Sequence, residues 1–303
     1  MADIVTQAHS HGVDFELRLE RVDLLPDTVA RGTVTITPRQ PIDARGIVAA
    51  LTATEQWRYR QTTTDGQGHT QTTIVTKTSE LQRLPVMLAA AAAVLQAGVP
   101  QQHAIEIPVP PLGPATLDAT VSRLTWSLEI KIDVGGGFDP SITVPVSVLQ
   151  PTALLRAGVV HVGEFALYDA ADSVAGEARA TIQIEPMPIC LGQPIEGTLT
   201  IETTSPLRVQ EVRLELRVKV RATVSSGEHE EITTWVGRLA PEGQFGGTSQ
   251  SIPFKADIPA RLLPTIELPH GTAQAEFHVI LAKAWAPDTH LVRDVALCTT
   301  TEV

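Results

Sequence analysis

Strict alternation of apolar and polar residues is the feature that most constrains how this chain folds. Residues 212–221, Val-Arg-Leu-Glu-Leu-Arg-Val-Lys-Val-Arg, alternate throughout, and residues 126–133 do the same. Shorter runs of this kind occur at 17–20 and 34–37. Successive side chains of a strand point to opposite faces of its sheet, so a period of two predicts strands with one buried and one solvated face. The sequence therefore predicts an all-β protein made of β-sandwiches.

One segment departs from this alternation. Residues 79–98, SELQRLPVMLAAAAAVLQAG, are rich in alanine and leucine and end at a glycine. Alanine is the best helix former, glycine commonly ends helices, and Pro85 would fall near the first turn. We therefore predict one short helix at about 81–97 that covers a sheet. Binding to a membrane surface is the alternative, although interfacial helices carry more Lys and Arg than this segment does.

An internal repeat divides the chain of 303 residues into two copies. At an offset of 165, Gly32–Ile36 (GTVTI) matches Gly197–Ile201 (GTLTI) with the same alternation. Further along, an offset of 151 matches Trp126 with Phe277. The first copy is thus longer by 165 − 151 = 14 residues, in the region of the expected helix. Self-similarity of this kind indicates two related domains, which we place at 1–150 and 178–303, joined by a linker at 151–177.

Composition excludes several classes of protein. The formal net charge is -11, and the acidic residues are spread over both halves, so a nucleic-acid partner is not expected. Cys190 and Cys298 are too few for a disulfide scaffold or a four-cysteine zinc site. We expect two free buried thiols, with a disulfide as the alternative if the first and last strands of the second copy meet. The N-terminal residues lack the features of a signal peptide, which favours a cytoplasmic protein.

Motifs of catalysis and metal binding are missing from the sequence. We find no nucleophile elbow, P-loop, zinc-protease motif or C-x-x-C pair. His9 and His11 could hold a metal from one strand face, but a frayed terminus is the simpler interpretation. The acidic segment 228–231 offers too few carboxylates for calcium and is expected to be a solvated hairpin. We therefore predict a non-enzymatic protein with no catalytic residue, no cofactor and no metal site.

The solvated face of residues 212–221 is the candidate site for a partner. It places Arg213, Arg217, Lys219 and Arg221 on one side of one strand. Guanidinium groups bind carboxylates and phosphates through paired hydrogen bonds, so an acidic or phosphorylated peptide or an anionic lipid head group could dock there. The alternative, which we favour, is that acidic residues of the next strand neutralise these cations. Those residues are Glu228, Glu230 and Glu231.

The order of motifs resembles that of arrestin-like two-domain proteins, a family that includes arrestins, the arrestin-like subunit of retromer and bacterial sporulation-control proteins. In the first copy the motifs are Gly32–Ile36, Glu55-Gln56-Trp57, the expected helix, Ile105–Pro108, Pro114-Ala115-Thr116, the Trp126 strand and the Asp139 loop. In the second copy they are Gly197–Ile201, Ile252-Pro253-Phe254, Ile258-Pro259, Pro264-Thr265 and the Phe277 strand. The buried Asp and Arg of the arrestin polar core have no counterparts that we can place.

This resemblance implies two tandem immunoglobulin-like, arrestin-like β-sandwiches, with the helix in the first. It also implies a non-enzymatic scaffold or adaptor that binds protein partners, here in bacterial regulation. A structural module of a secretion or cell-envelope apparatus is the alternative, and an enzyme with an unrecognised site near Asp169 and Asp172 is a third possibility. Peripheral membrane association and the oligomeric state stay open.

Overall fold

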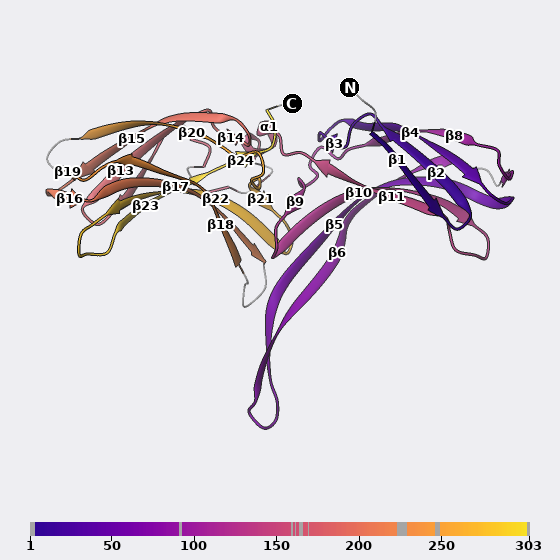
Figure 1. The fold of residues 1–303 in the computed structure, drawn as a ribbon, viewed down its shortest axis with the longest axis horizontal. Helices are drawn as coiled ribbons and strands as arrows, with labels where there is room; N and C mark the ends of the chain where they lie inside the picture. The colour runs from indigo at the N-terminus through magenta and orange to yellow at the C-terminus, as the bar shows by residue number, and fades with distance from the viewer. Residues whose placement is uncertain are drawn as a thin grey trace. The chain divides into compact units, whose positions relative to one another are not determined.

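The structure is a computed structural model that describes residues 4–90, 93–158, 160, 162–163, 166–168, 170–222, 229–245 and 249–301. Strands make up nearly all of the regular secondary structure of these residues, which confirms the all-β prediction (Figure 1). Within these ranges α1 (Thr152–Arg156) is the one helix, and it is far too short to cross a bilayer. The chain divides into two compact units. Unit 1 is Met1–Gln56, Lys77–Thr116 and Leu124–Leu149, and unit 2 is Trp57–Thr76, Leu117–Arg123 and Gln150–Val303.

Most residues of two sheets with buried alternating residues belong to unit 1, whereas Trp57–Thr76 and Leu117–Arg123 of these strands belong to unit 2. The first sheet has the order β1 (Ile4–Ser10), β2 (Val13–Leu19), β4 (Val29–Pro38), β8 (Gln101–Pro108). The second has the order β3 (Asp23–Leu24), β11 (Ser141–Val148), β10 (Ser122–Val134), β5 (Ile42–Thr64), β6 (Thr70–Ala89), with β7 (Ala93–Leu95) on β5 and β9 (Leu117–Asp118) on β10. The core of unit 1 includes Phe15, Leu17, Val34, Ile36, Leu51, Trp126 and Leu128.

Unit 2 repeats this plan. One sheet has the order β12 (Ala170–Ala175), β13 (Ala178–Glu185), β15 (Pro194–Thr203), β20 (Gln250–Asp257). The other has the order β18 (His229–Ala240), β17 (Glu211–Ala222), β22 (Gly271–Ala282), β21 (Ile266–Glu267), with β23 (Thr289–Val295) on β22. Two short pairs complete it: β14 (Ile189–Cys190) with β24 (Leu297–Cys298), and β16 (Leu207–Val209) with β19 (Gly243–Phe245). The stretch expected to be a linker, 151–177, carries α1 and β12 within this unit.

The helix predicted at about 81–97 is wrong. The segment up to Ala89 belongs to β6, and 93–95 form β7, which pairs with the start of β5. Leu84, Val86 and Leu88 alternate with the more exposed Pro85 and Met87, so this part has a period of two despite its helix-forming composition. Among the described strands β6 is the last of its sheet, a position that tolerates a proline because no ladder hydrogen bond is lost on the open side.

The repeat is real, but its second offset is two residues smaller than expected. Val29 pairs with Pro108, and its counterpart Pro194 pairs with Asp257, which gives offsets of 165 and 149. The offset of 149 matches Phe277 with Leu128 rather than with Trp126. The extra length of the first copy lies in a hairpin and not in a helix: β5 has 23 residues against 12 in β17, and β6 has 20 against 12 in β18.

The repeated glycine has a packing reason in both copies. A Cβ atom at Gly197 would lie 2.4 Å from the Gln183 carbonyl oxygen and 2.4 Å from the ring of Phe254. At Gly32 it would lie 2.4 Å from the Arg18 carbonyl oxygen. Only a residue without a side chain fits such a close approach in a strand, so the G-x-[VL]-x-I pattern follows from the fold.

Candidate functional site

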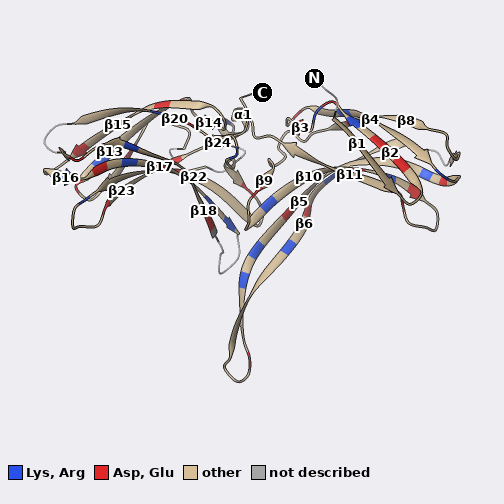
Figure 2. Ribbon diagram, in the orientation of Figure 1, with Lys and Arg blue, Asp and Glu red and all other residues tan. Residues whose placement is uncertain are grey.

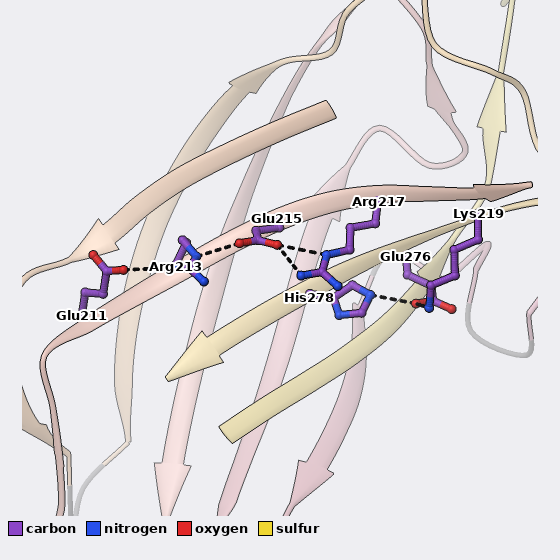
Figure 3. A network of polar contacts seen from close by, with 7 residues as sticks. All are labelled: Glu211, Arg213, Glu215, Arg217, Lys219, Glu276 and His278. Atoms are coloured by element: carbon purple, nitrogen blue, oxygen red, sulfur yellow. Dashed lines mark hydrogen bonds and ion pairs between the residues drawn. The ribbon is translucent and has the colours of Figure 1, made fainter. Parts of the chain in front are cut away.

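The four predicted cations lie on the outer face of β17 in unit 2. The alternate residues of this strand are buried as predicted, with exposed fractions of 0 to 1 % for Val212, Leu214, Leu216, Val218 and Val220. Arg213, Arg217 and Lys219 point away from this core and join a polar network with residues of β22 (Figure 3). Arg221 is exposed at the end of the same strand.

Glu215 is the centre of one half of this network. Its carboxylate accepts hydrogen bonds from Arg217, at 2.7 Å from Nη2 and 3.0 Å from Nε, and from Arg213 Nε at 2.7 Å. Arg213 also donates to Glu211 at 3.0 Å. Glu215 is only 7 % exposed, so its charge depends on these two arginines for compensation.

Glu276 is the centre of the other half. This residue comes from β22, where the register places it opposite Arg217, and it accepts a hydrogen bond from Lys219 Nζ at 2.7 Å. The Nε2 of His278 lies 2.8 Å from the same carboxylate oxygen. His278 is 6 % exposed and is paired with Glu215 across the strands. One carboxylate therefore binds both a lysine and a histidine in a partly buried setting.

The pKa values of the network follow from burial and from these partners. Burial alone would raise the pKa of Glu215 and of Glu276. The hydrogen bonds and charges of Arg217 and Arg213 at Glu215, and of Lys219 and His278 at Glu276, together outweigh burial, so both pKa values lie below that of an ordinary glutamate. Burial lowers the pKa of His278, which keeps the imidazole neutral at neutral pH. Burial and the charge of Glu276 raise the pKa of Asp294 on β23.

Carboxylates of β17 and β22 neutralise three of the four cations, Arg213, Arg217 and Lys219. The partners are Glu211 and Glu215 on the same strand and Glu276 on β22. Glu230 instead accepts hydrogen bonds from Thr120, at 2.8 Å from the backbone nitrogen. Glu228 and the side chain of Glu231 lie outside the described part of the chain. Figure 2 shows the acidic and basic positions interleaved along β17. An anionic ligand at Arg217 or Lys219 would have to displace a carboxylate that is already bound.

The other sequence candidates do not come together into a site. His9 belongs to β1 and lies 2.8 Å from Asp14, whereas His11 stacks on Phe138 at 5.4 Å between ring centroids. Residues 4–10 thus form a paired strand and are not frayed, and the two histidines contact different partners. No group of three His, Cys, Asp or Glu able to hold a metal occurs among the described residues.

The structure also locates the two cysteines and Asp172, one of the two aspartates considered for an unrecognised enzyme site. Cys190 and Cys298 are opposite each other in the parallel pair β14–β24, and both are buried free thiols. Burial, followed by the neighbouring Cys190, raises the pKa of the Cys298 thiol. Asp172 is bound by Arg179 and by Thr181 Oγ1 at 2.5 Å, and Asp169 is outside the described residues.

Trp285 is a functional candidate that our sequence interpretation missed. It lies in the loop between β22 and β23, its side chain is 104 % exposed, and its backbone is left-handed with φ of 62°. The loop is closed by a hydrogen bond from the Lys283 nitrogen to Asp288 Oδ1 at 3.1 Å. The same two residues line a groove of about 380 Å³, together with Leu207. The sequence signal was available: Ala-Trp-Ala-Pro-Asp places a tryptophan within a turn.

No protein-family model matches this chain, and a search of curated proteins finds no similar sequence.

Proposed function

We propose that this protein is a non-enzymatic, arrestin-like adaptor of the bacterial cytoplasm that binds protein partners. The observation that carries the proposal is Trp285, a fully exposed tryptophan held on a left-handed backbone at a loop tip. Tryptophan is among the residues most enriched at the centres of protein interfaces. Its large apolar surface is unfavourable in water and becomes favourable in a partner's pocket.

The backbone conformation supports the same interpretation. A bulky residue with positive φ costs about 1–3 kcal/mol, and such strain tends to occur where a side chain has a task. In the corresponding loop of the first copy, between β10 and β11, the positive φ of 80° falls on Gly136, as expected where only conformation matters. At Trp285 the chain places a costly residue at a position that a glycine would occupy more easily.

The contacts favour Trp285 over the cationic strand as the main docking residue. Arg213, Arg217 and Lys219 already bind carboxylates, and Arg221 is the exposed end of that strand. An acidic or phosphorylated peptide at Arg213, Arg217, Lys219 and Arg221 is the second proposal, since such a ligand could exchange with Glu276 on Lys219.

The test is crosslinked affinity capture from the native host, done separately on cytosolic and membrane fractions. Trp285→Ser is compared with wild type, with Phe138→Ser as the matched exposed aromatic (83 % exposed), and with a variant that carries Ser at the four cationic positions. We expect a partner that Phe138→Ser retains and Trp285→Ser loses, with unchanged thermal unfolding for both. Equal recovery by wild type and Trp285→Ser would refute the role of Trp285. A partner lost only with the four-cation variant would favour the strand instead.

The same experiment separates the two classes of function. An adaptor should be recovered with a regulatory partner from the cytosolic fraction. Recovery only with components of a secretion or envelope assembly, in the membrane fraction, would favour a structural module.

A further inference from the structure

The distal part of the β5–β6 hairpin is exposed on both of its faces. Residues 60–74 are all exposed, including Ile74 at 55 %, and Figure 1 shows the two strands continuing together as a hairpin. Threonine hydroxyls are paired across it, Thr62 with Thr72 at 3.1 Å and Thr64 with Thr70 at 3.3 Å. A two-stranded hairpin without a covering layer is only marginally stable in water, and a third strand would stabilise it.

The open edge of β6 is protected in one half and unprotected in the other. Natural edge strands avoid unwanted pairing by means of proline and charged residues. The proximal half of β6 has Lys77, Glu80, Arg83 and Pro85. The distal half, 70–76 (TQTTIVT), has neither a charged residue nor a proline, and no described strand pairs with its outer side. This edge is therefore free to pair with another strand.

The distribution of charge along the chain shows where a second copy can approach most easily. The formal net charge of -11 makes two copies repel each other over most of their surfaces. Residues 61–76 contain a single charged residue, Asp65, which is engaged in the turn by the nitrogens of Gln67 and His69. Figure 2 shows this part of the hairpin almost without charged positions. It is a stretch of surface on which like-charge repulsion between copies is smallest.

We infer that the distal half of β6 pairs in antiparallel fashion with the same segment of a second copy, about a twofold axis at Thr73. This register places Thr70 opposite Thr76, Gln71 opposite Val75, and Thr72 opposite Ile74. Five of the six residues in these pairs are Thr, Val or Ile, which suit half-exposed sheets, and no pair brings charges together. Pairing through β5 would instead bring Arg58 and Arg60 of the two copies toward each other. The result is a four-stranded sheet made of two hairpins.

This inference is independent of the adaptor proposal, since it concerns the hairpin and not Trp285. The test is sedimentation velocity of the full chain over about three decades of concentration, because a single strand pair buries less surface than a stable dimer needs and binds weakly. The mass is expected to rise from 32.5 kDa toward twice this value. Thr73→Lys places two lysines opposite each other at the axis and should weaken association at least about tenfold. Thr63→Lys, on β5 of the same hairpin, is the matched control and should associate like wild type.

Hydrogen exchange locates the interface. The amides of 70–76 should become protected as the concentration of wild type rises, and those of Thr73→Lys should not. Wild type that stays at 32.5 kDa at every concentration overturns the inference. So does a dimer that Thr73→Lys forms as well as Thr63→Lys, or one whose concentration-dependent protection lies outside 70–76.

Discussion

Replacing Arg217 with methionine tests the energetic role of the β17–β22 network. The change removes two hydrogen bonds to Glu215, at 2.7 and 3.0 Å, while most of the aliphatic stem is kept. Hydrogen bonds to charged groups contribute about 1.5–3 kcal/mol, and breaking a fully buried ion pair costs about 3–5 kcal/mol. Glu215 is 7 % exposed but keeps its bond to Arg213, so we expect a loss of about 2 kcal/mol in the free energy of unfolding.

The assay is urea unfolding at pH 7 with a matched control. Arg208→Met removes an ion pair with Glu242 in the same unit, but those side chains are 81 % and 59 % exposed. Exposed pairs contribute about 0–1 kcal/mol, so the control should stay close to wild type. A double-mutant cycle of Arg217→Met with Glu215→Gln should give a coupling of about 1–2 kcal/mol, as expected for residues in direct contact. Equal effects of Arg217→Met and Arg208→Met would show that the burial of Glu215 has no energetic consequence.

The pH dependence gives an independent check. Because the pKa of Glu215 is lower in the folded state than its ordinary value of 4.5, the carboxylate contributes stability that is present above pH 4.5 and lost as the pH falls through the folded pKa. Arg217→Met removes the main donor that lowers this pKa, so the variant should lose less stability than wild type as the pH falls below 4.5. An unchanged acid dependence would contradict this assignment.

Two further predictions concern packing and thiol chemistry. Gly197→Ala should cost about 1–3 kcal/mol, because the new methyl group meets the Gln183 carbonyl oxygen and the Phe254 ring, whereas Gly135→Ala, with nothing within 4 Å, should be neutral in the same unfolding assay. In the native protein Cys190 and Cys298 should resist a thiol reagent at pH 8, because both are buried and the pKa of Cys298 is raised. Labelling should begin only with unfolding in urea, so rapid labelling of the folded protein would refute this placement.

Local alternation of apolar and polar residues predicted the strands. Amino-acid composition gave a wrong prediction at 81–97, where strands contain helix-forming residues. In β17 every apolar position is buried, because period-two patterning decides which face enters the core. In β6 the alanine and leucine content favoured a helix, yet Leu84 and Val86 belong to the edge strand of a sheet. Pairing within the sheet outweighs intrinsic helix propensity, which differs by less than about 1 kcal/mol per residue.

The candidate site was predictable in part. Arg213, Arg217 and Glu215 were visible on one face of one strand, since they are neighbours in the sequence. Glu276 and His278 were not, because they approach β17 only through the β17–β22 register, more than 50 residues away in the chain. The carboxylate that binds Lys219 could therefore not be identified from the sequence alone.

The two copies indicate which parts of the chain serve folding and which serve something else. Val148 N binds Thr116 Oγ1 in unit 1, and Leu297 N binds Thr265 Oγ1 in unit 2, at the same offset of 149 as the paired strands. Positions kept in both copies therefore have shared structural reasons. The extra length of the β5–β6 hairpin has no equivalent in β17 and β18, and Trp285 lies in a loop where the first copy has glycines. Neither feature is required by the common sandwich, so function is best sought at these two places, where each copy departs from the other.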